Sequence, residues 1–220
     1  MQIVNKIFIS GIPLSYCFTN KTRIPKILGI PEKQTIQRFS NKRKNEFLTG
    51  RWCVNKALDA LGVNNFSPPC GDKGEPIWPG NVKGSISHSN NITGAVVSSD
   101  PGCRALGLDI ESQVRKISPQ AVLFFTNPDE IKLIETGEIS ANIIFSIKES
   151  VLKALSFYLD EKVFFDFFSV KLDDEKVKIG KYTLNLYSVK INNKQKKIPA
   201  NITGGFFVVN YEIISFCLID

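Results

Sequence analysis

The 220 residues predict an α+β fold, and three observations lead to this class. Apolar residues alternate with a two-residue period at 106–111, and residues 3–9 and several runs after 164 also read as strands. Residues 41–61 and the segment around Glu149 instead repeat apolar residues at helical spacing. A short internal echo, Val54-Asn55-Lys56-Ala57-Leu58 against Val151-Leu152-Lys153-Ala154-Leu155, favours two similar halves.

The first hundred residues predict a strand at 3–9, a basic stretch punctuated by prolines, and then a helix from Asn41 to Leu61. Gly62 suits the end of this helix, whose apolar face is predicted to be Phe47, Trp52 or Val54, Leu58 and Leu61. A loop rich in Gly and Pro covers 67–84, and a hairpin with arms 85–88 and 92–98 follows.

The turn at Asp100-Pro101-Gly102 marks the predicted domain boundary, which gives an N-terminal half, 1–102, and a C-terminal half, 103–220. After the strand at 106–111 we expect a helical stretch from Pro119 to Leu133 and then the helix that carries Glu149. The remaining sequence is rich in predicted strands, at 170–172, 182–189, 206–209 and 213–219.

Composition is that of a soluble globular protein, with 43% hydrophobic and 22% charged residues. A net charge of +7 indicates a surface that attracts anions: nucleic acid, a polyphosphorylated small molecule or an acidic protein. No apolar run approaches the roughly 20 residues needed to cross a bilayer, and residues 7–9 are too short for a signal peptide. We therefore expect a cytoplasmic protein without membrane contact.

Five cysteines are present, and none forms a C-x-x-C pair, so neither a zinc ribbon nor a thioredoxin-like site is indicated. Cys53 and Cys217 lie within apolar patterns and are expected to be buried. All five are expected to be reduced thiols.

Two short segments carry most of the chemical information. In Leu106–Glu111 the two-residue period places Asp109 and Glu111 on one strand face and the aliphatic residues on the other. Together with Glu149 they form a set of carboxylates suited to Mg²⁺ beside a phosphate, because Mg²⁺ prefers oxygen ligands and often completes its shell with substrate phosphates. The alternative is that Asp109 and Glu111 form the solvent face of an edge strand.

On the second segment, Ile147, Val151, Leu155 and Tyr158 form an apolar helical stripe, while Glu149, Lys153 and Ser156 share another face. Lys153 is a candidate for charge stabilisation or proton donation at a leaving phosphate. The alternative is an exposed Glu–Lys pair worth about 0.2–0.5 kcal/mol. Lys148 points elsewhere on the helix, toward phosphate or solvent.

Basic groups of the first half are candidates for binding phosphate. His88, the only histidine, lies in the small polar segment Gly84-Ser85-Ile86-Ser87-His88-Ser89, as a ligand-contacting donor or as a plain strand-end residue. Arg43 and Arg51 are eight residues apart, close to two helical turns, so both can lie on one face. Guanidinium groups suit phosphate oxygens, although a basic, solvated helix end is the alternative.

Five blocks together resemble the 4′-phosphopantetheinyl transferases, most closely those of the enterobactin synthase component D type. The resemblance runs from about Arg43 to Ala154. The blocks are Gly50-Arg51-Trp52-Cys53-Val54, Gly74-Glu75-Pro76-Ile77-Trp78-Pro79, Gly84-Ser85-Ile86-Ser87-His88-Ser89, Gly107-Leu108-Asp109-Ile110-Glu111 and Phe145-Ser146-Ile147-Lys148-Glu149-Ser150-x-x-Lys153-Ala154.

The resemblance implies transfer of the phosphopantetheine arm of coenzyme A (CoA) to a serine of an acidic carrier protein, with release of 3′,5′-ADP, in siderophore, non-ribosomal peptide or polyketide biosynthesis. It also implies a pseudo-twofold pair of similar halves, each a helix packed on a small antiparallel sheet, for which a monomer is sufficient. Mg²⁺ would be held by Asp109, Glu111 and Glu149.

The resemblance further implies that Glu149 helps to deprotonate the acceptor serine and that Lys153 stabilises the departing phosphate. The implied ligands of the 3′-phosphate and adenosine end are Arg43, Arg51, Ser87, His88 and the loop of Asp72, Lys73 and Gly74. Two rival classes stay open on the residues alone: a Mg²⁺-dependent phosphodiesterase or nuclease using the same carboxylates, and a nucleic-acid-binding module driven by the +7 charge. No recognised nucleic-acid motif supports the second, so no nucleic-acid partner is expected.

Overall fold

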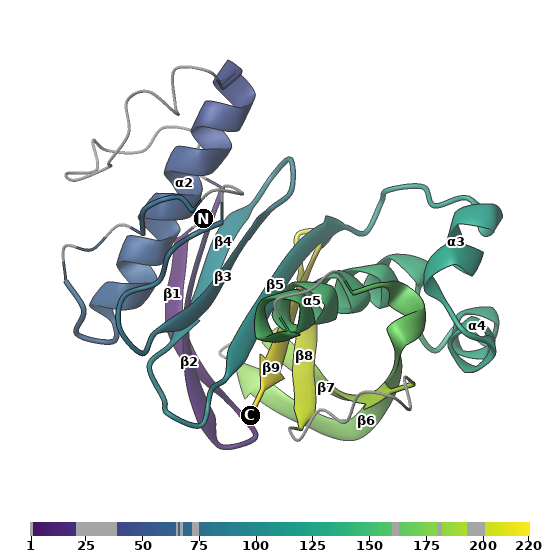
Figure 1. The fold of residues 1–220 in the computed structure, drawn as a ribbon. Coiled ribbons are helices and arrows are strands. Elements are labelled where there is room, and N and C mark those ends of the chain that lie inside the picture. The colour runs from purple at the N-terminus through teal and green to yellow at the C-terminus, as the bar shows by residue number, and fades with distance from the viewer. Residues whose placement is uncertain are drawn as a thin grey trace. The chain divides into compact units, whose positions relative to one another are not determined.

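A computed structural model of the protein describes residues 2–20, 39–64, 66, 68–71, 75–159, 163–179, 182–192 and 201–220. The chain forms two compact units, Met1–Pro101 and Gly102–Asp220. Each combines an antiparallel sheet with a 19-residue helix (Figure 1). The predicted α+β class with two similar halves is confirmed.

The first unit is a four-stranded antiparallel sheet of order β1-β2-β4-β3. Its strands are β1 (Gln2–Ile9), β2 (Ile12–Thr19), β3 (Lys83–His88) and β4 (Thr93–Ser98). Helix α2 (Asn41–Asp59) packs on β2 and β4. The core between them comprises Cys17, Trp52, Cys53, Val54, Ala57, Leu58, Val82, Ala95 and Val97. The predicted helix and its apolar face are thus largely confirmed.

Both ends of α2 follow from local sequence. The Ser40 hydroxyl caps the first turn by accepting a hydrogen bond from the Arg43 backbone N–H at 3.2 Å. Gly62 follows the helix with φ +81°, a left-handed conformation that glycine adopts without steric cost.

Strand β2 was missed by the sequence analysis, which assigned no strand to residues 10–40. Ser10 and Gly11 both have positive φ, 50° and 78°, and form the two-residue turn that joins Ile9 to Ile12. Seven of the eight residues of β2 are buried, and its second residue is Pro13, a residue that is uncommon inside strands.

The second unit is a five-stranded antiparallel sheet of order β5-β9-β8-β7-β6. Its strands are β5 (Ala105–Ser112), β6 (Phe168–Ile179), β7 (Tyr182–Ile191), β8 (Ile202–Val209) and β9 (Glu212–Ile219). The short helix η1 (Phe165–Phe167) precedes β6. Helix α5 (Ala141–Leu159) packs on β5 and β9.

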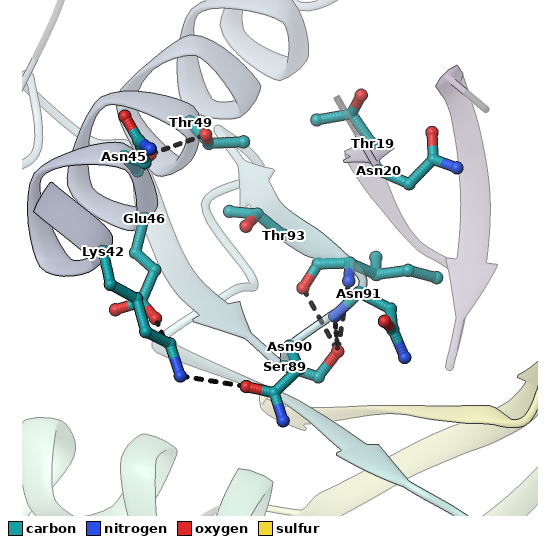
Figure 2. Close-up of a pocket in the computed structure, with 11 residues that line it drawn as sticks. Thr19, Asn20, Lys42, Asn45, Glu46, Thr49, Ser89, Asn90, Asn91 and Thr93 are labelled. Atoms are coloured by element: carbon teal, nitrogen blue, oxygen red, sulfur yellow. Dashed lines mark hydrogen bonds and ion pairs between the residues drawn. The ribbon is translucent and has the colours of Figure 1, made fainter. Parts of the chain in front are cut away.

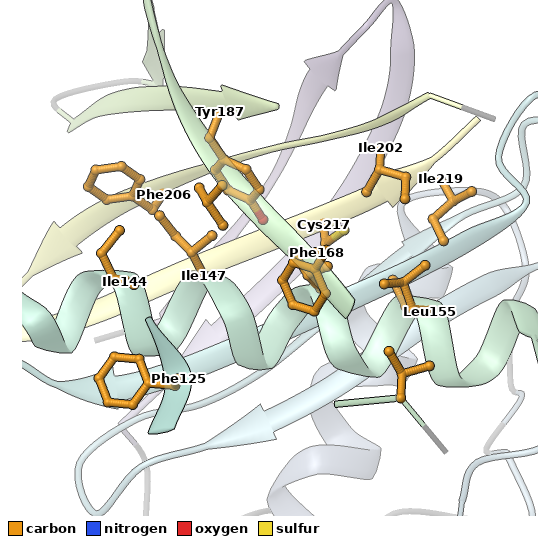
Figure 3. Close-up of a cluster of buried hydrophobic side chains, with 14 of the residues drawn as sticks. Phe125, Ile144, Ile147, Leu155, Phe168, Tyr187, Ile202, Phe206, Cys217 and Ile219 are labelled. Carbon is orange, nitrogen blue, oxygen red and sulfur yellow. The ribbon is translucent and has the colours of Figure 1, made fainter. Parts of the chain in front are cut away.

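The predicted apolar stripe of α5 forms the centre of the second core. Ile147, Val151 and Leu155 are fully buried, while Tyr158 is only partly so. Figure 3 shows α5 crossing the sheet, with Ile147 and Leu155 among side chains of the strands such as Phe168 and Tyr187. This packing fixes the rotation of α5 about its axis.

The internal echo corresponds to matching patterns of burial on the two long helices. In both five-residue segments the first, fourth and fifth residues are fully buried, and the second and third are partly exposed. The lysine at the third position therefore lies at the border of the buried face in both units. It is Lys56 in α2 and Lys153 in α5.

The stretch predicted to be helical, Pro119–Leu133, is helical except at Thr126 and Asn127, where it is interrupted. The structure has two helices, α3 (Pro119–Phe125) and α4 (Pro128–Glu135). Pro128 has no backbone N–H and disfavours helical geometry in the residue before it. Asn127 begins α4 in a capping box with Glu130, in which each side chain accepts a hydrogen bond from the other's backbone N–H.

Two further expectations concern membranes and cysteines. Among the described helices, none is both long enough and apolar enough to cross a membrane. All five cysteines are free thiols, as predicted, and Cys53 and Cys217 are completely buried.

Candidate active site

The close approach of β5 to α5 depends on Gly107. A Cβ atom at this position would lie 1.8 Å from the backbone carbonyl oxygen of Ser150 in α5. Any larger residue would therefore force the helix away from the strand. Because strand side chains alternate, Asp109 lies on the same face of β5 as Gly107, directed toward α5.

Asp109 and Lys153 meet across this contact. The Lys153 ammonium donates to Asp109 Oδ1 at 2.8 Å and to the backbone carbonyl of Leu108 at 2.9 Å. The Asp109 side chain is 11% exposed, and that of Lys153 is 35% exposed. Asp109 is therefore not part of a solvated strand face, and the simple alternative of an exposed Glu–Lys pair does not describe Lys153.

Glu111 lies two residues further along the same face of β5. Its carboxylate accepts from the Ser112 backbone N–H at 2.8 Å and pairs with the Arg115 guanidinium at 2.5 Å. The Arg115 guanidinium also lies over the ring of Phe145 in α5, 5.4 Å from its centroid. Arg115 was not singled out by the sequence analysis, because an i,i+4 spacing predicts a contact only on a helix and Glu111 lies at the end of a strand.

Glu149 lies within electrostatic range of both acidic residues. Burial raises the pKa of the Glu149 carboxyl, and the negative charges of Asp109 and Glu111 raise it further. Lys153 and Arg115 act in the opposite direction. The charges of Asp109, Glu111 and Lys153 therefore all act on the Glu149 carboxyl within the second unit.

The carboxylates do not form a ready-made metal cage. Within the ranges that the structure describes, no three His, Cys, Asp or Glu side chains are grouped closely enough to hold a metal ion. Two of the carboxylates are instead paired with protein cations, Asp109 with Lys153 and Glu111 with Arg115. The donor atoms are nevertheless all carboxylate oxygens, which are the ligands that Mg²⁺ prefers.

The prediction that the Lys148 side chain points toward phosphate or solvent is wrong. Its ammonium is buried and lies 2.7 Å from Glu130 of α4, and it also donates to the Phe165 carbonyl at 3.4 Å. Burial lowers the pKa of the Lys148 ammonium, and Glu130 acts against this change. The pair fastens α5 to α4 and orients the helix just before Glu149.

In the first unit, Arg43 and His88 are brought together although they are 45 residues apart. Arg43 Nη1 lies 3.2 Å from His88 Nε2. Glu46 lies beside both groups, with one carboxylate oxygen 3.6 Å from the Arg43 nitrogen and 3.5 Å from the His88 nitrogen. Ser87, the other residue of this segment singled out from sequence, is buried in β3.

A pocket of about 170 Å³, lined mostly by polar residues, adjoins this cluster (Figure 2). It lies between the first half of α2, the end of β2 and the turn between β3 and β4. Lys42 and Glu46 line it, together with Asn90, whose side-chain oxygen accepts from Lys42 at 3.0 Å. Glu46 was missed by the sequence analysis, although it lies three residues after Arg43 on the same helix.

Arg51 occupies a different environment from Arg43. It is 3% exposed, with its guanidinium 4.8 Å from the centroid of the Phe47 ring and 3.3 Å from the Cys70 sulfur. The predicted loop of Asp72, Lys73 and Gly74 lies outside the described residues.

Comparison with known protein families identifies the class to which this two-unit α+β chain belongs. A model of the 4′-phosphopantetheinyl transferase N-terminal domain matches residues 31–98, and the model of the 4′-phosphopantetheinyl transferase superfamily matches residues 105–206. The chain belongs to this superfamily.

Particular relatives support the same assignment. Enterobactin synthase component D of Escherichia coli is 30% identical over 158 residues, which cover 70% of this chain and 71% of the relative. Its counterpart in Salmonella typhimurium is 32% identical over 139 residues, or 59% of this chain and 56% of the relative. The 4′-phosphopantetheinyl transferase PptT of Mycobacterium tuberculosis is 41% identical over 100 residues, or 45% and 43%. The chain thus spans only about half the length of the latter two.

Proposed function

We propose that this protein transfers the 4′-phosphopantetheine group of CoA to a serine of a carrier protein and releases 3′,5′-ADP. The observation that carries the proposal is the contact of Asp109 with Lys153 across β5 and α5, with Glu149 in the same electrostatic site. Membership of the superfamily and the similarity to enterobactin synthase component D support it.

In this reaction the serine oxygen attacks the phosphorus atom that bears the pantetheine arm. A new P–O bond forms while the bond to the bridging oxygen of the pyrophosphate breaks, and that oxygen leaves as part of 3′,5′-ADP. We assign acceptance of the serine proton to Glu149, directly or through water. Its raised pKa supports this role, because a carboxylate of higher pKa is a stronger base.

We assign Lys153 to the leaving group, whereas Glu149 acts on the attacking serine. Its ammonium, held in place by Asp109 and the Leu108 carbonyl, stabilises the negative charge that develops on the leaving phosphate. A positioned cation of this kind needs no reorganisation during the reaction.

Asp109, Glu111 and Glu149 are the residues proposed to hold Mg²⁺, which would neutralise the pyrophosphate and polarise its phosphorus. Their oxygen donors suit this ion, and their mutual repulsion at Glu149 would be relieved by a bound cation. Arg43 and His88 are proposed to bind the 3′-phosphate, with Arg51 and Ser87 supporting them. The N-terminal unit would thus bind CoA, and the C-terminal unit would carry the chemistry.

The proposed acceptor is an acidic carrier protein, since the chain has a net charge of +7 and would attract such a partner. The names of the relatives favour carrier domains of siderophore or non-ribosomal peptide synthesis.

The decisive experiment is intact-mass analysis of several apo carrier proteins incubated with this protein, CoA and Mg²⁺. We expect a gain of one phosphopantetheine group on at least one carrier, and its loss in Asp109→Ala and Glu149→Ala. Incubation with CoA alone tests for hydrolysis. Full activity of both variants, or hydrolysis of CoA without transfer, would overturn the proposal.

A further inference from the structure

Three basic side chains of the first unit surround the single carboxylate of Glu46. One oxygen of this group lies 4.0 Å from Lys42 Nζ, and the other lies 3.6 Å from Arg43 Nη1 and 3.5 Å from His88 Nε2. The Glu46 side chain is 16% exposed, against 34% for His88 and 49% for Arg43. The acid is thus the most deeply placed member, and the basic groups are more accessible.

Glu46 supports the contact between Arg43 and His88 in either protonation state of the imidazole. The two residues come from different elements, α2 and β3, and Arg43 donates directly to His88 Nε2 at 3.2 Å when that nitrogen is unprotonated. A guanidinium is permanently charged, so a protonated imidazole at this distance would be repelled. One oxygen of Glu46 is close to both nitrogens, and its negative charge offsets that repulsion.

Holding long side chains in one arrangement also has an entropic cost. A flexible arginine loses rotamer freedom when it binds a ligand, and preorganisation removes part of that loss. On the pocket side of Glu46, the Lys42 ammonium lies 4.0 Å from a Glu46 oxygen and donates to the Asn90 side-chain oxygen (Figure 2). Glu46 therefore links His88 of β3 to Arg43 of α2.

We infer that Glu46 is a positioning residue, which holds Arg43 and His88 ready for a phosphate monoester and does not itself contact that phosphate. The inference rests on the proposed function, in which this monoester is the 3′-phosphate of CoA. Two negative groups in direct contact would repel each other, so the role of Glu46 is exerted through the two donors.

The test compares CoA with dephospho-CoA, which lacks only the 3′-phosphate. For Glu46→Ala we expect the KM for CoA to rise about tenfold, the loss expected for one charge-assisted hydrogen bond. We expect kcat to stay within about twofold and the KM for dephospho-CoA to be unchanged, because the chemistry occurs elsewhere. Glu46→Gln retains an oxygen acceptor and should raise the KM for CoA less.

Asp59→Ala provides the matched control. Asp59 lies on the same helix and forms a similar i,i+3 ion pair with Lys56 at 3.1 Å, at the opposite end. This variant should leave the KM for both substrates unchanged. Calorimetric titration of each variant with both ligands gives the same comparison without turnover.

An equal loss of affinity for CoA and dephospho-CoA in Glu46→Ala would overturn the inference, since a merely structural role weakens both. Unchanged or tighter binding of CoA would overturn it as well. If Glu46→Ala does not fold, Glu46→Gln provides the test. The inference would then be wrong if Glu46→Gln preferred CoA over dephospho-CoA as strongly as the wild type does. Absence of transfer by the wild type, with selective CoA binding intact, would count against the proposed function alone.

Discussion

The Lys153 ammonium lies 2.8 Å from Oδ1 of Asp109, and this contact joins α5 to β5 at the centre of the candidate site. Its two residues are 44 positions apart in sequence. The same ammonium donates to the Leu108 carbonyl, so its position is set by strand backbone as well as by charge. Asp109 therefore has a neutralising partner before any other cation binds, and Lys153 is held beside the acids.

The first prediction concerns Lys153 itself. Replacing it by methionine keeps much of the side-chain volume but removes the ammonium that we assign to the leaving phosphate. We expect a reduction in kcat of about 10²–10³-fold, the size of effect seen when one charge-stabilising donor is removed. The rate of carrier modification by intact mass measures this. Lys176→Met, at an exposed position of β6, serves as the control; equal activities of the two variants would contradict the role of Lys153.

A second prediction tests the close contact of β5 and α5. Gly107→Ala would place a carbon 1.8 Å from a backbone oxygen of α5, which cannot rotate away. We expect the free energy of unfolding to fall by about 3 kcal/mol, at the upper end of overpacking effects. Gly50→Ala in α2 would meet side-chain methyl groups, the nearest being Ile86 Cγ2 at 2.9 Å, and no backbone atom; it should cost less than Gly107→Ala, about 1 kcal/mol. Urea unfolding of both variants distinguishes these outcomes.

The buried pair of Lys148 and Glu130 leads to a third prediction. Glu130→Ala leaves the Lys148 charge without its partner and removes the acceptor of the Val170 backbone N–H. We expect a loss of about 3–5 kcal/mol. The double variant Lys148→Met, Glu130→Leu should be more stable than Glu130→Ala because no isolated charge remains. By comparison, Lys56→Ala breaks an exposed pair and should lower the free energy of unfolding by less than about 1 kcal/mol. Equal losses in Glu130→Ala and Lys56→Ala would contradict a special cost of leaving Lys148 buried and unpaired.

A fourth prediction follows from the raised pKa of Glu149. A carboxyl whose folded-state pKa lies above its ordinary value of 4.5 stabilises the folded state only while it is protonated. This contribution is present below pH 4.5 and is lost as the pH rises through the folded-state pKa. Glu149→Gln should therefore unfold at a higher temperature than the wild type at pH 7. The difference should be small, below about 1 kcal/mol, because a partly exposed group is screened.

The advantage of Glu149→Gln should disappear when thermal unfolding is measured below pH 4.5, where the wild-type carboxyl is protonated in both states. Added Mg²⁺ should raise the unfolding temperature of the wild type more than that of the variant, because the proposed site loses a ligand charge. Equal shifts in both proteins would argue against Glu149 as a ligand.

The comparison of sequence with structure separates local signals from long-range ones. The apolar stripe of α5 was predicted because helical periodicity is a local property. The break at Asn127-Pro128 was also encoded locally, in a capping residue and a proline, but it was overlooked. Strand β2 was missed for a different reason: it contains Pro13, a residue that is uncommon inside strands, whereas β4 and β9, which are just as buried, were predicted.

By itself, the sequence determined the elements that carry the site, the faces on which Asp109, Glu111 and Glu149 lie, and the family. Only the tertiary structure decided partners: Lys153 with Asp109, Lys148 with the buried Glu130, and Arg43 with His88 beside Glu46. Spacing along one helix or strand follows from its repeat. Contacts between elements instead depend on how closely each helix can approach its sheet, as Gly107 allows in β5.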